Sequence, residues 1–260
     1  MSDPAGHDHP GHDHAGHGPS DSAGIAWTGR QVTSTGFDND LGQADPALIA
    51  VLTERRAGDA DDMALMRAIE KARFVVPIVA APAEVDDSGE LTVEKQTDMA
   101  AVTLTAPDGQ RALPVFTGIE ALANWDASAR PVPVTASRAA QAAVSEQCHV
   151  MVLDVGSDHA TELRPSMVWA LAQQRDWAPA HTDDQVADAV AQAVAGHAEI
   201  TGHVLAEGKP AGQGILQVVL ELTPGLDAEQ VQALVTAVAE QVATDGEVRA
   251  RIDGLAFSLR

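Results

Sequence analysis

Histidine is concentrated at the start of this sequence, where its side chains could bind a metal ion. Five imidazoles fall within eleven residues, at His7, His9, His12, His14 and His17. They belong to three copies of a pentapeptide that begins Gly-His-Asp-His and ends in proline or alanine, the last copy being truncated. Neutral imidazoles with nearby carboxylates are ligands for zinc, nickel, copper and cobalt. The tail is therefore predicted to bind a divalent metal, with nickel and zinc as the main candidates.

Glycine and proline separate the histidine pairs, so residues 1–24 are predicted to be a disordered tail without a preorganised site. Metal bound to such a segment exchanges readily, which suits storage or delivery better than catalysis. The alternative interpretation is a solubilising, low-complexity tail whose metal affinity is incidental.

A second group of chemically active side chains follows the apolar run 148–153. Asp154, Asp158, His159 and Glu162 lie in and after a loop rich in glycine and serine. Ligands of open α/β sheets gather outside the carboxyl ends of the strands, which is where this loop is predicted to lie. The loop is the best enzyme-like segment of the chain, although no nucleophile and no spaced third ligand accompany it.

Other reactive arrangements are excluded by their spacing. Cys148 and His149 are neighbours, so on a strand they point to opposite faces and cannot form a thiolate–imidazolium pair. Asp38 and Asp40 suggest a calcium loop, but Gly42 occupies the position that requires a third oxygen ligand. The sequence contains no P-loop, dinucleotide-binding glycine fingerprint, nucleophile elbow or HExxH motif.

Composition restricts the classes of partner and compartment. The chain of 260 residues has 16 basic and 38 acidic side chains, giving a net charge of -22, so nucleic acid would be repelled. One cysteine rules out an internal disulfide and is consistent with a reducing compartment. No apolar run approaches the length of a membrane helix and no basic, apolar leader is present. We therefore expect a cytoplasmic protein that binds neither membrane nor nucleic acid.

Periodicity predicts two folded domains, residues 25–175 and residues 182–260, joined by a linker. The first is predicted to be a mixed α/β domain. Its expected elements are helices capped by Asp45 and Asp59, a strand at 74–79 with an edge or bulge at Pro77, a hairpin of 99–105 and 111–116, a helix from a capping box at 117–120, a strand at 132–135, a helix at 137–146, a central strand at 148–153 and a helix near 162–173.

The second domain is predicted to be a smaller α+β unit, so the fold class of the whole chain is α+β. A capping box at 182–185 predicts a helix with Val186, Val190 and Val194 on one face. Apolar and polar residues alternate over 215–222, which indicates a strand covered on one side. Asp227 is expected to cap a helix, and a last strand is expected to contain a bulge at Gly254.

Several segments together resemble a known protein family. They are Trp27, Gly29 and Arg30, the stretch from Phe37 to Gly42 leading to Asp45 and Pro46, Val76-Pro77-Ile78, the stretch from Met99 to Leu104, Asp108-Gly109, the stretch from Leu113 to Thr117, and Val152-Leu153-Asp154. They resemble the N-terminal domain of the SseB family, the enhanced-serine-sensitivity proteins. The stretch from Leu220 to Leu226, together with Arg249 and Asp253-Gly254-Leu255, resembles that family's C-terminal domain.

The resemblance implies a bacterial, cytoplasmic protein with no catalytic residues and no required cofactor to carry over to this chain. Its alanine-rich, tyrosine-free composition is similar to that of actinobacterial members, whereas the histidine tail is not part of the family pattern. We expect a non-enzymatic module that recruits a protein partner. The alternatives are a metal-handling accessory protein for nickel or zinc and a small hydrolase or transferase using the loop 154–162.

Overall fold

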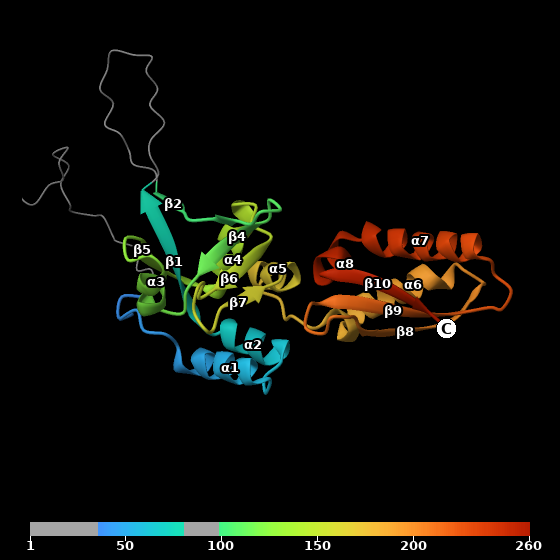
Figure 1. The fold of residues 1–260 in the computed structure, drawn as a ribbon, viewed down its shortest axis with the longest axis horizontal. Helices are drawn as coiled ribbons and strands as arrows, with labels where there is room; N and C mark the ends of the chain where they lie inside the picture. The colour runs from blue at the N-terminus through green and yellow to red at the C-terminus, as the bar shows by residue number, and fades with distance from the viewer. Residues whose placement is uncertain (1–35, 81–98) are drawn as a thin grey trace, which may run out of the picture. The chain divides into compact units, whose positions relative to one another are not determined.

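The computed structural model describes residues 36–80 and 99–260 (Figure 1), so the predicted histidine ligands lie outside the described residues. Residues 41–260 form one compact unit, in which we distinguish an N-terminal lobe, residues 46–173, and a C-terminal lobe, residues 180–259. The N-terminal lobe contains α1 (Pro46–Ala57), α2 (Asp62–Ile69), β1 (Arg73–Ala80), β2 (Met99–Ala101), β3 (Leu104–Thr105), β4 (Arg111–Val115), α3 (Ile119–Trp125), β5 (Arg130–Thr135), α4 (Ala136–Ser145), β6 (Val150–Leu153), β7 (Thr161–Leu163) and α5 (Pro165–Gln173). The C-terminal lobe contains η1 (Ala180–Thr182), α6 (Asp184–Ala195), β8 (Ile200–Glu207), β9 (Ile215–Leu222), α7 (Ala228–Thr244), α8 (Gly246–Arg251) and β10 (Gly254–Leu259). The α+β class predicted from the sequence is confirmed.

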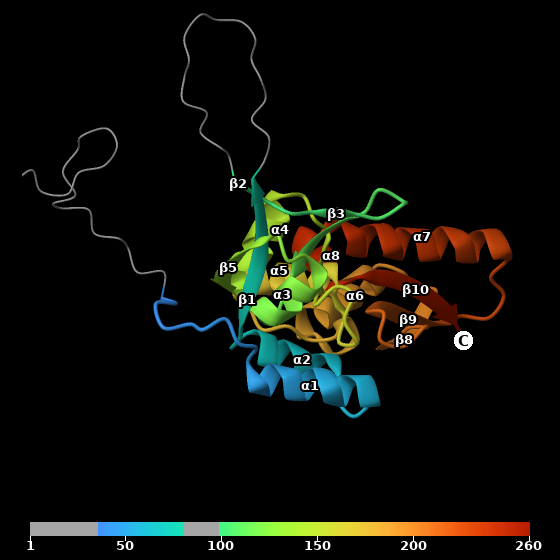
Figure 2. The ribbon, with the colours of Figure 1, turned by 60° about the vertical axis from the view of Figure 1, so that its left-hand side comes forward.

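The first two helices, α1 and α2, pack against each other, as two views of the fold show (Figure 1, Figure 2). Asp45 caps α1 as predicted, its carboxylate accepting a hydrogen bond from the first turn. The predicted cap of α2 at Asp59 is wrong, because Asp61 caps that helix instead. Gly58, in the left-handed conformation, ends α1. The residues after it form the turn between the two helices, so α2 begins later than predicted.

A three-stranded antiparallel sheet has the order β2-β1-β5. The prediction of an edge or bulge at Pro77 is wrong, because β1 is the middle strand and its register with β5 is continuous through Pro77. Pro77 lies opposite Pro131, and its carbonyl oxygen accepts a hydrogen bond from Val102 on the β2 side. A pair of opposed prolines fits a position where neither strand donates to the other, so no hydrogen bond between β1 and β5 is lost at this pair.

A four-stranded sheet has the order β3-β4-β6-β7, with β4 and β6 parallel. The predicted hairpin is confirmed for β3 and β4, which pair antiparallel across the turn 106–110. Residues 99–101 differ from the prediction, since they pair with β1 in the other sheet. The prediction that β6 is a buried internal strand is confirmed. Because β4 and β6 run in the same direction, the segments that follow them emerge at one edge of the sheet.

The core of the N-terminal lobe lies between these sheets and the helices α1, α2, α4 and α5. Ala139, Ala140 and Ala143 form the buried face of α4, and such small side chains allow the helix to approach its neighbours closely. Cys148 is buried in the same cluster, as predicted, and burial raises the pKa of its thiol. A separate cluster contains Phe116, whose ring centroid is 5.3 Å from that of Trp125. This second cluster holds α3 against the sheet.

The C-terminal lobe is a sheet of order β10-β9-β8 with helices on one face. β8 and β9 form an antiparallel hairpin, while β10 is parallel to β9 after the helical crossover through α7 and α8. Leu216, Val218 and Leu220 alternate on the buried face of β9, as predicted. Asp227 caps α7 with the expected geometry, in a reciprocal capping box with Gln230.

Two predictions for this lobe are wrong in detail. The bulge predicted at Gly254 is wrong. Residues 246–251 form the helix α8, and Gly254 is the first residue of the strand β10. The predicted capping box of α6 is replaced by Asp183, whose carboxylate accepts from two backbone N–H groups. Across residues 36–80 and 99–260, no helix combines the length and the apolar character that crossing a membrane requires.

Candidate functional site

The largest chemically distinctive cavity lies beyond the carboxyl ends of β4 and β6, and we call it the Asp154 pocket. Its volume is about 910 Å³. Four parts of the chain build it: the stretch 41–44, Ile49 of α1, the stretch 117–125 that includes α3, and the loop after β6. The lining residues are Leu41, Gly42, Gln43, Ala44, Ile49, Thr117, Gly118, Ile119, Glu120, Ala121, Asn124, Trp125, Asp154, Val155, Gly156, Ser157 and His159.

Asp154 is the most buried ionisable residue of this pocket, with 3% of its surface exposed. Its carboxylate accepts two hydrogen bonds from Thr117, one from the backbone N–H to Oδ1 at 2.8 Å and one from the hydroxyl to Oδ2 at 2.9 Å. Its own N–H donates to the carbonyl of Val115 at 2.9 Å. Asp154 therefore joins the ends of the two parallel strands β4 and β6.

The role of Thr117 explains why the capping box predicted at 117–120 is wrong. Gly118 is the N-cap of α3 and makes no side-chain cap hydrogen bond. The Thr117 hydroxyl, which a capping box would direct to the helix, donates to Asp154 instead. The helix does start where the local pattern predicted it. The Thr117 hydroxyl, however, donates to Asp154, which is distant in the sequence, and so does not cap the helix.

His159 lies on the loop opposite α3 and also lines the pocket. Its Nδ1 atom is buried and has no hydrogen-bond partner among the described residues. The backbone N–H of His159 donates to the hydroxyl of Ser157 at 3.0 Å. Since that hydrogen bond uses the backbone rather than the imidazole, it does not activate Ser157 as a nucleophile.

Charge in the Asp154 pocket is unbalanced. Its ionisable lining residues are Glu120, Asp154 and His159, with no lysine or arginine among them. Burial raises the pKa of Asp154 above its ordinary value, opposed by the two hydrogen bonds from Thr117 and by the nearby His159. A buried carboxylate that is held by neutral donors retains capacity for a cationic partner.

The stretch 41–44 is held across the start of α3. Arg73 donates from Nη2 to the carbonyl of Gln43 at 2.6 Å and from Nη1 to the carbonyl of Thr117 at 2.8 Å. A Cβ on Gly118 would come within 2.8 Å of the carbonyl oxygen of Gly42, so only glycine permits this approach. The stretch therefore forms a fixed wall of the pocket.

Two large apolar side chains are exposed at the rim of the pocket. Leu41 is 78% exposed and Ile119 is 45% exposed. The two residues belong to neighbouring segments, because the N–H of Ile119 donates to the carbonyl of Gly42 at 2.9 Å. An apolar rim above a buried acid is an arrangement suited to an amphipathic ligand.

A second cavity of about 810 Å³ lies between the two lobes, and Arg55, Asp62, Arg164, Arg251 and Asp253 of its lining already form ion pairs within the protein. Arg164, 8% exposed, donates to Asp253 at 2.9 Å, to Asp62 at 2.7 Å and to the carbonyl of Gly212 at 2.8 Å. Its guanidinium also lies 5.7 Å from the centre of the Trp177 ring. Arg164 thus joins both lobes through one side chain.

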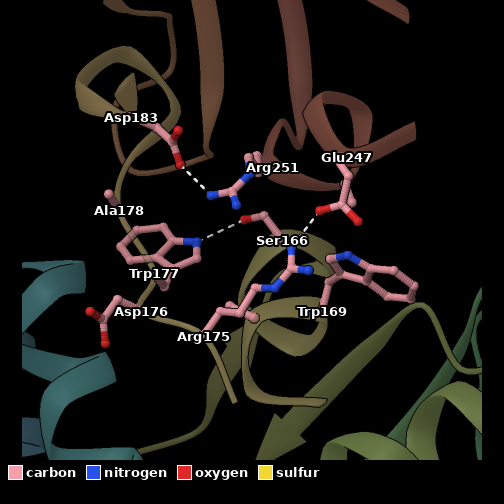
Figure 3. Close-up of a pocket in the computed structure, with 11 residues that line it drawn as sticks. Ser166, Trp169, Arg175, Asp176, Trp177, Ala178, Asp183, Glu247 and Arg251 are labelled. Atoms are coloured by element: carbon pink, nitrogen blue, oxygen red, sulfur yellow. Dashed lines mark hydrogen bonds and ion pairs between the residues drawn. The ribbon is translucent and has the colours of Figure 1, made fainter. Parts of the chain in front are cut away.

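The adjoining pocket, shown in Figure 3, is bounded by two tryptophans and two interlobe contacts. Trp177 donates from its indole N–H to the hydroxyl of Ser166, which in turn donates to Asp253. Arg175 forms an ion pair with Glu247 of α8. These partners lie within the protein itself, so this region functions as the joint between the lobes rather than as a ligand site.

The predicted loop 154–162 contributes only part of its polar residues to the pocket. Asp154 and His159 line it, whereas Asp158 pairs with Arg56 at 2.9 Å on the surface and Glu162 is exposed on β7. Within the described ranges, no group of three or more histidine, cysteine or acidic residues is placed to hold a metal. Thr117 was missed as part of the site because its contact with Asp154 spans 37 residues.

Residues 47–170 match the family model described as SseB protein N-terminal domain. The matched segment contains Thr117, Asp154 and His159 but not the stretch 41–44. No curated protein and no solved structure matches the chain. The resemblance of the C-terminal residues to the second SseB domain stays a prediction.

Proposed function

Because this chain carries an SseB N-terminal domain and is a member of that family, we propose that it is a non-enzymatic, cytoplasmic protein-interaction module that binds a segment of a partner protein in the Asp154 pocket. The observation that supports the proposal is that Leu41 and Ile119, two large apolar side chains that line this pocket, are both exposed. Exposed apolar groups that border a cavity mark interaction sites on soluble proteins.

Peptide display with the full-length chain as bait tests the proposal. Selected peptides are expected to bind one per chain in calorimetry and to lose at least about tenfold in affinity when Leu41 and Ile119 are both replaced by serine, a change of about 1.4 kcal/mol. Val204→Ser is the matched control, because Val204 is 49% exposed on β8, away from the pocket. Equal binding to the double variant would refute the assignment of the pocket.

We propose as a second function that the histidine tail binds nickel or zinc through His7, His9, His12, His14 and His17. The density of imidazole in residues 7–17 supports this role, which would make the protein a metal-handling accessory factor. The full-length chain should bind several ions per molecule in equilibrium dialysis, and deletion of residues 1–19 should leave almost none. A matched control replaces only the five histidines by alanine. Unchanged stoichiometry in either variant would contradict the proposal.

An enzymatic alternative, a small hydrolase or transferase, also uses Asp154 and His159. The observation favouring it is the positive φ of 50° at Asp154, since strained backbone clusters at active sites. An unbiased substrate screen that yields a turnover abolished by Asp154→Asn would support this alternative and refute the non-enzymatic proposal. A turnover that is unchanged in that variant would exclude Asp154 from the chemistry.

A further inference from the structure

We propose that the floor of the Asp154 pocket is a binding subsite for a cationic side chain, the ammonium of lysine or the guanidinium of arginine, with Asp154 as the counter-charge. This inference rests on the proposed function, because it specifies the chemistry of the segment that the pocket would bind. It makes the expected ligand an apolar group at the rim followed by a cation that reaches the floor.

The hydrogen bonds of Asp154 leave room for such a partner. Each carboxylate oxygen accepts one hydrogen bond from Thr117, whereas a carboxylate offers about four acceptor sites. Both donors are neutral, so they orient the carboxylate without neutralising it. A ligand cation would supply the charge-assisted hydrogen bonds that the described residues do not.

The surroundings of Asp154 favour a cation over an anion. Glu120 adds a second acid to the lining, and His159 is the one lining residue that can become positive. The nearby arginines are occupied elsewhere: Arg73 donates to two carbonyl groups, and Arg56 pairs with Asp158 on the surface. Neither arginine lines the pocket.

His159 provides the second polar contact of the subsite. Its buried Nδ1 has no partner among the described residues, and in the tautomer protonated at the other nitrogen it accepts a hydrogen bond. An ammonium group can donate to Asp154 and to this nitrogen together, because it carries three N–H donors. The subsite thus satisfies a buried acceptor that would otherwise stay unpaired.

Exposed apolar side chains and a buried acid in one pocket suit a basic side chain. Leu41 and Ile119 at the rim are exposed, while Asp154 is 3% exposed below them. Lysine and arginine carry an apolar stem of three or four methylene groups before the charge. Their stems can contact the rim while the charged end reaches the carboxylate.

Acidification is expected to weaken binding, because protonation of Asp154 removes the counter-charge. The other charged or titratable groups of the lining are Glu120 and His159. Near the site, Arg73 of β1 donates to the carbonyl of Thr117 and Arg56 of α1 pairs with Asp158.

The test uses n-hexylammonium chloride and the neutral probe 1-hexanol with the full-length protein. Binding is followed through the backbone amide signal of Thr117, whose N–H donates directly to Asp154. The amine should shift that signal saturably and bind at least about tenfold more tightly than hexanol, and the preference should disappear in Asp154→Asn. Asparagine keeps an acceptor oxygen for Thr117, so the fold is retained while the charge is lost.

Equal affinity for the two probes, or an unchanged preference in Asp154→Asn, would overturn the subsite. Asp188→Asn is the matched control, and it should keep the preference because Asp188 is exposed on α6 and does not line the pocket. Peptide measurements separate this inference from the proposed function. Displayed peptides that bind regardless of replacing lysine by norleucine would leave the protein-binding function in place and refute the subsite. Binding of the amine without any selectable peptide would support the subsite and refute the protein-binding function.

Discussion

At the scale of single residues, Asp154 combines a local conformational cost with a tertiary role. Its φ of 50° lies in the left-handed region, which aspartate tolerates better than most residues because its short side chain forms local hydrogen bonds. Three hydrogen bonds, two from Thr117 and one to Val115, hold it there. The position is consequently defined by contacts between strands rather than by the loop that contains it.

The raised pKa of Asp154 predicts how stability changes with pH. Between the ordinary aspartate pKa and the raised pKa of the folded protein, the folded state binds more protons than the unfolded state. The free energy of unfolding should therefore contain a contribution that falls as pH rises through this window and is constant above it. Urea titrations of the wild type and Asp154→Asn across acidic pH measure this contribution as the difference between them. If the wild type instead gained stability relative to the variant as pH rose, the pKa of this carboxyl could not be raised by folding.

Gly214 is a second residue whose identity is fixed by a distant contact. A Cβ there would lie 2.2 Å from Oδ2 of Asp253 and 2.7 Å from Nε of Arg164, and its φ is +70°. We expect Gly214→Ala to cost about 3 kcal/mol or more in unfolding free energy, the scale of a broken buried ion pair. Gly212→Ala is the control, because its φ is +77° with open space around the added atom, so it should cost only the backbone strain of about 1 to 2 kcal/mol. Equal losses in both variants would show that the clash is relieved without cost.

At the scale of elements, the helix starts are determined by aspartate side chains. Asp45, Asp61, Asp183, Asp227 and Asp245 each cap a helix. A carboxylate at this position satisfies free N–H groups and interacts favourably with the positive end of the helix dipole. Part of the large negative charge of the chain is thus used to stabilise its helices.

The capping box of α7 allows this effect to be measured. Asp227→Ala should lower the unfolding free energy by about 1 kcal/mol, because the hydrogen bond from the N–H of Gln230 is lost. Asp227→Ser retains an acceptor at the same place and should recover most of the loss. Denaturation of the three proteins followed by circular dichroism gives the values. A serine variant as unstable as alanine would assign the loss to charge rather than to the hydrogen bond.

Elements defined by local pattern were predictable from the sequence. The strand β9 has apolar residues at every second position from Leu216 to Leu222, and α1 and α7 have an aspartate immediately before an apolar face. These signals depend only on residues close together in the chain. The strand β2 was assigned to the wrong partner. It pairs with β1, which is distant in the sequence, and local pattern does not indicate contacts between distant residues.

The candidate site was likewise predictable only where it depends on residues close together in the chain. Asp154 was identified because it follows a buried parallel strand, a position defined by the order of elements. Thr117 and Leu41 were not, since they reach the pocket from separate segments. The helix α8 was not predicted, for another reason. The spacing of apolar residues over its six positions fits a short helix and a strand about equally well.

At the scale of the whole molecule, buried and exposed ion pairs connect the same two lobes. The pair of Arg164 with Asp253 has side chains 9% and 6% exposed, while that of Arg175 with Glu247 has 47% and 51%. Removing one partner of a buried pair leaves an uncompensated charge in a dry environment. Exposed pairs contribute little, because water and salt screen them.

Arg164→Met and Arg175→Met therefore form a matched comparison. Arg164→Met should lower the unfolding free energy by about 3 to 5 kcal/mol, since it leaves the buried Asp253 without a counter-charge and removes one of the two arginines that pair with Asp62. Arg175→Met should cost less than about 1 kcal/mol. Chemical denaturation measures both, and limited proteolysis of residues 176–183 reports opening of the joint. Similar losses in the two variants would show that burial does not determine the strength of these contacts.

The N-terminus of α5 has its acceptor in the other lobe, with a consequence for dividing the chain. Asp253 accepts a hydrogen bond from the N–H of Ser166 at 2.8 Å, in the first turn of α5, 87 residues before it in the sequence. A fragment ending after Trp177 would lack this acceptor, and the other fragment would expose the carboxylate of Asp253 without its partners. Two such halves expressed together should reassemble. The protein could therefore be divided into a split reporter, in which reassembly depends on Asp253.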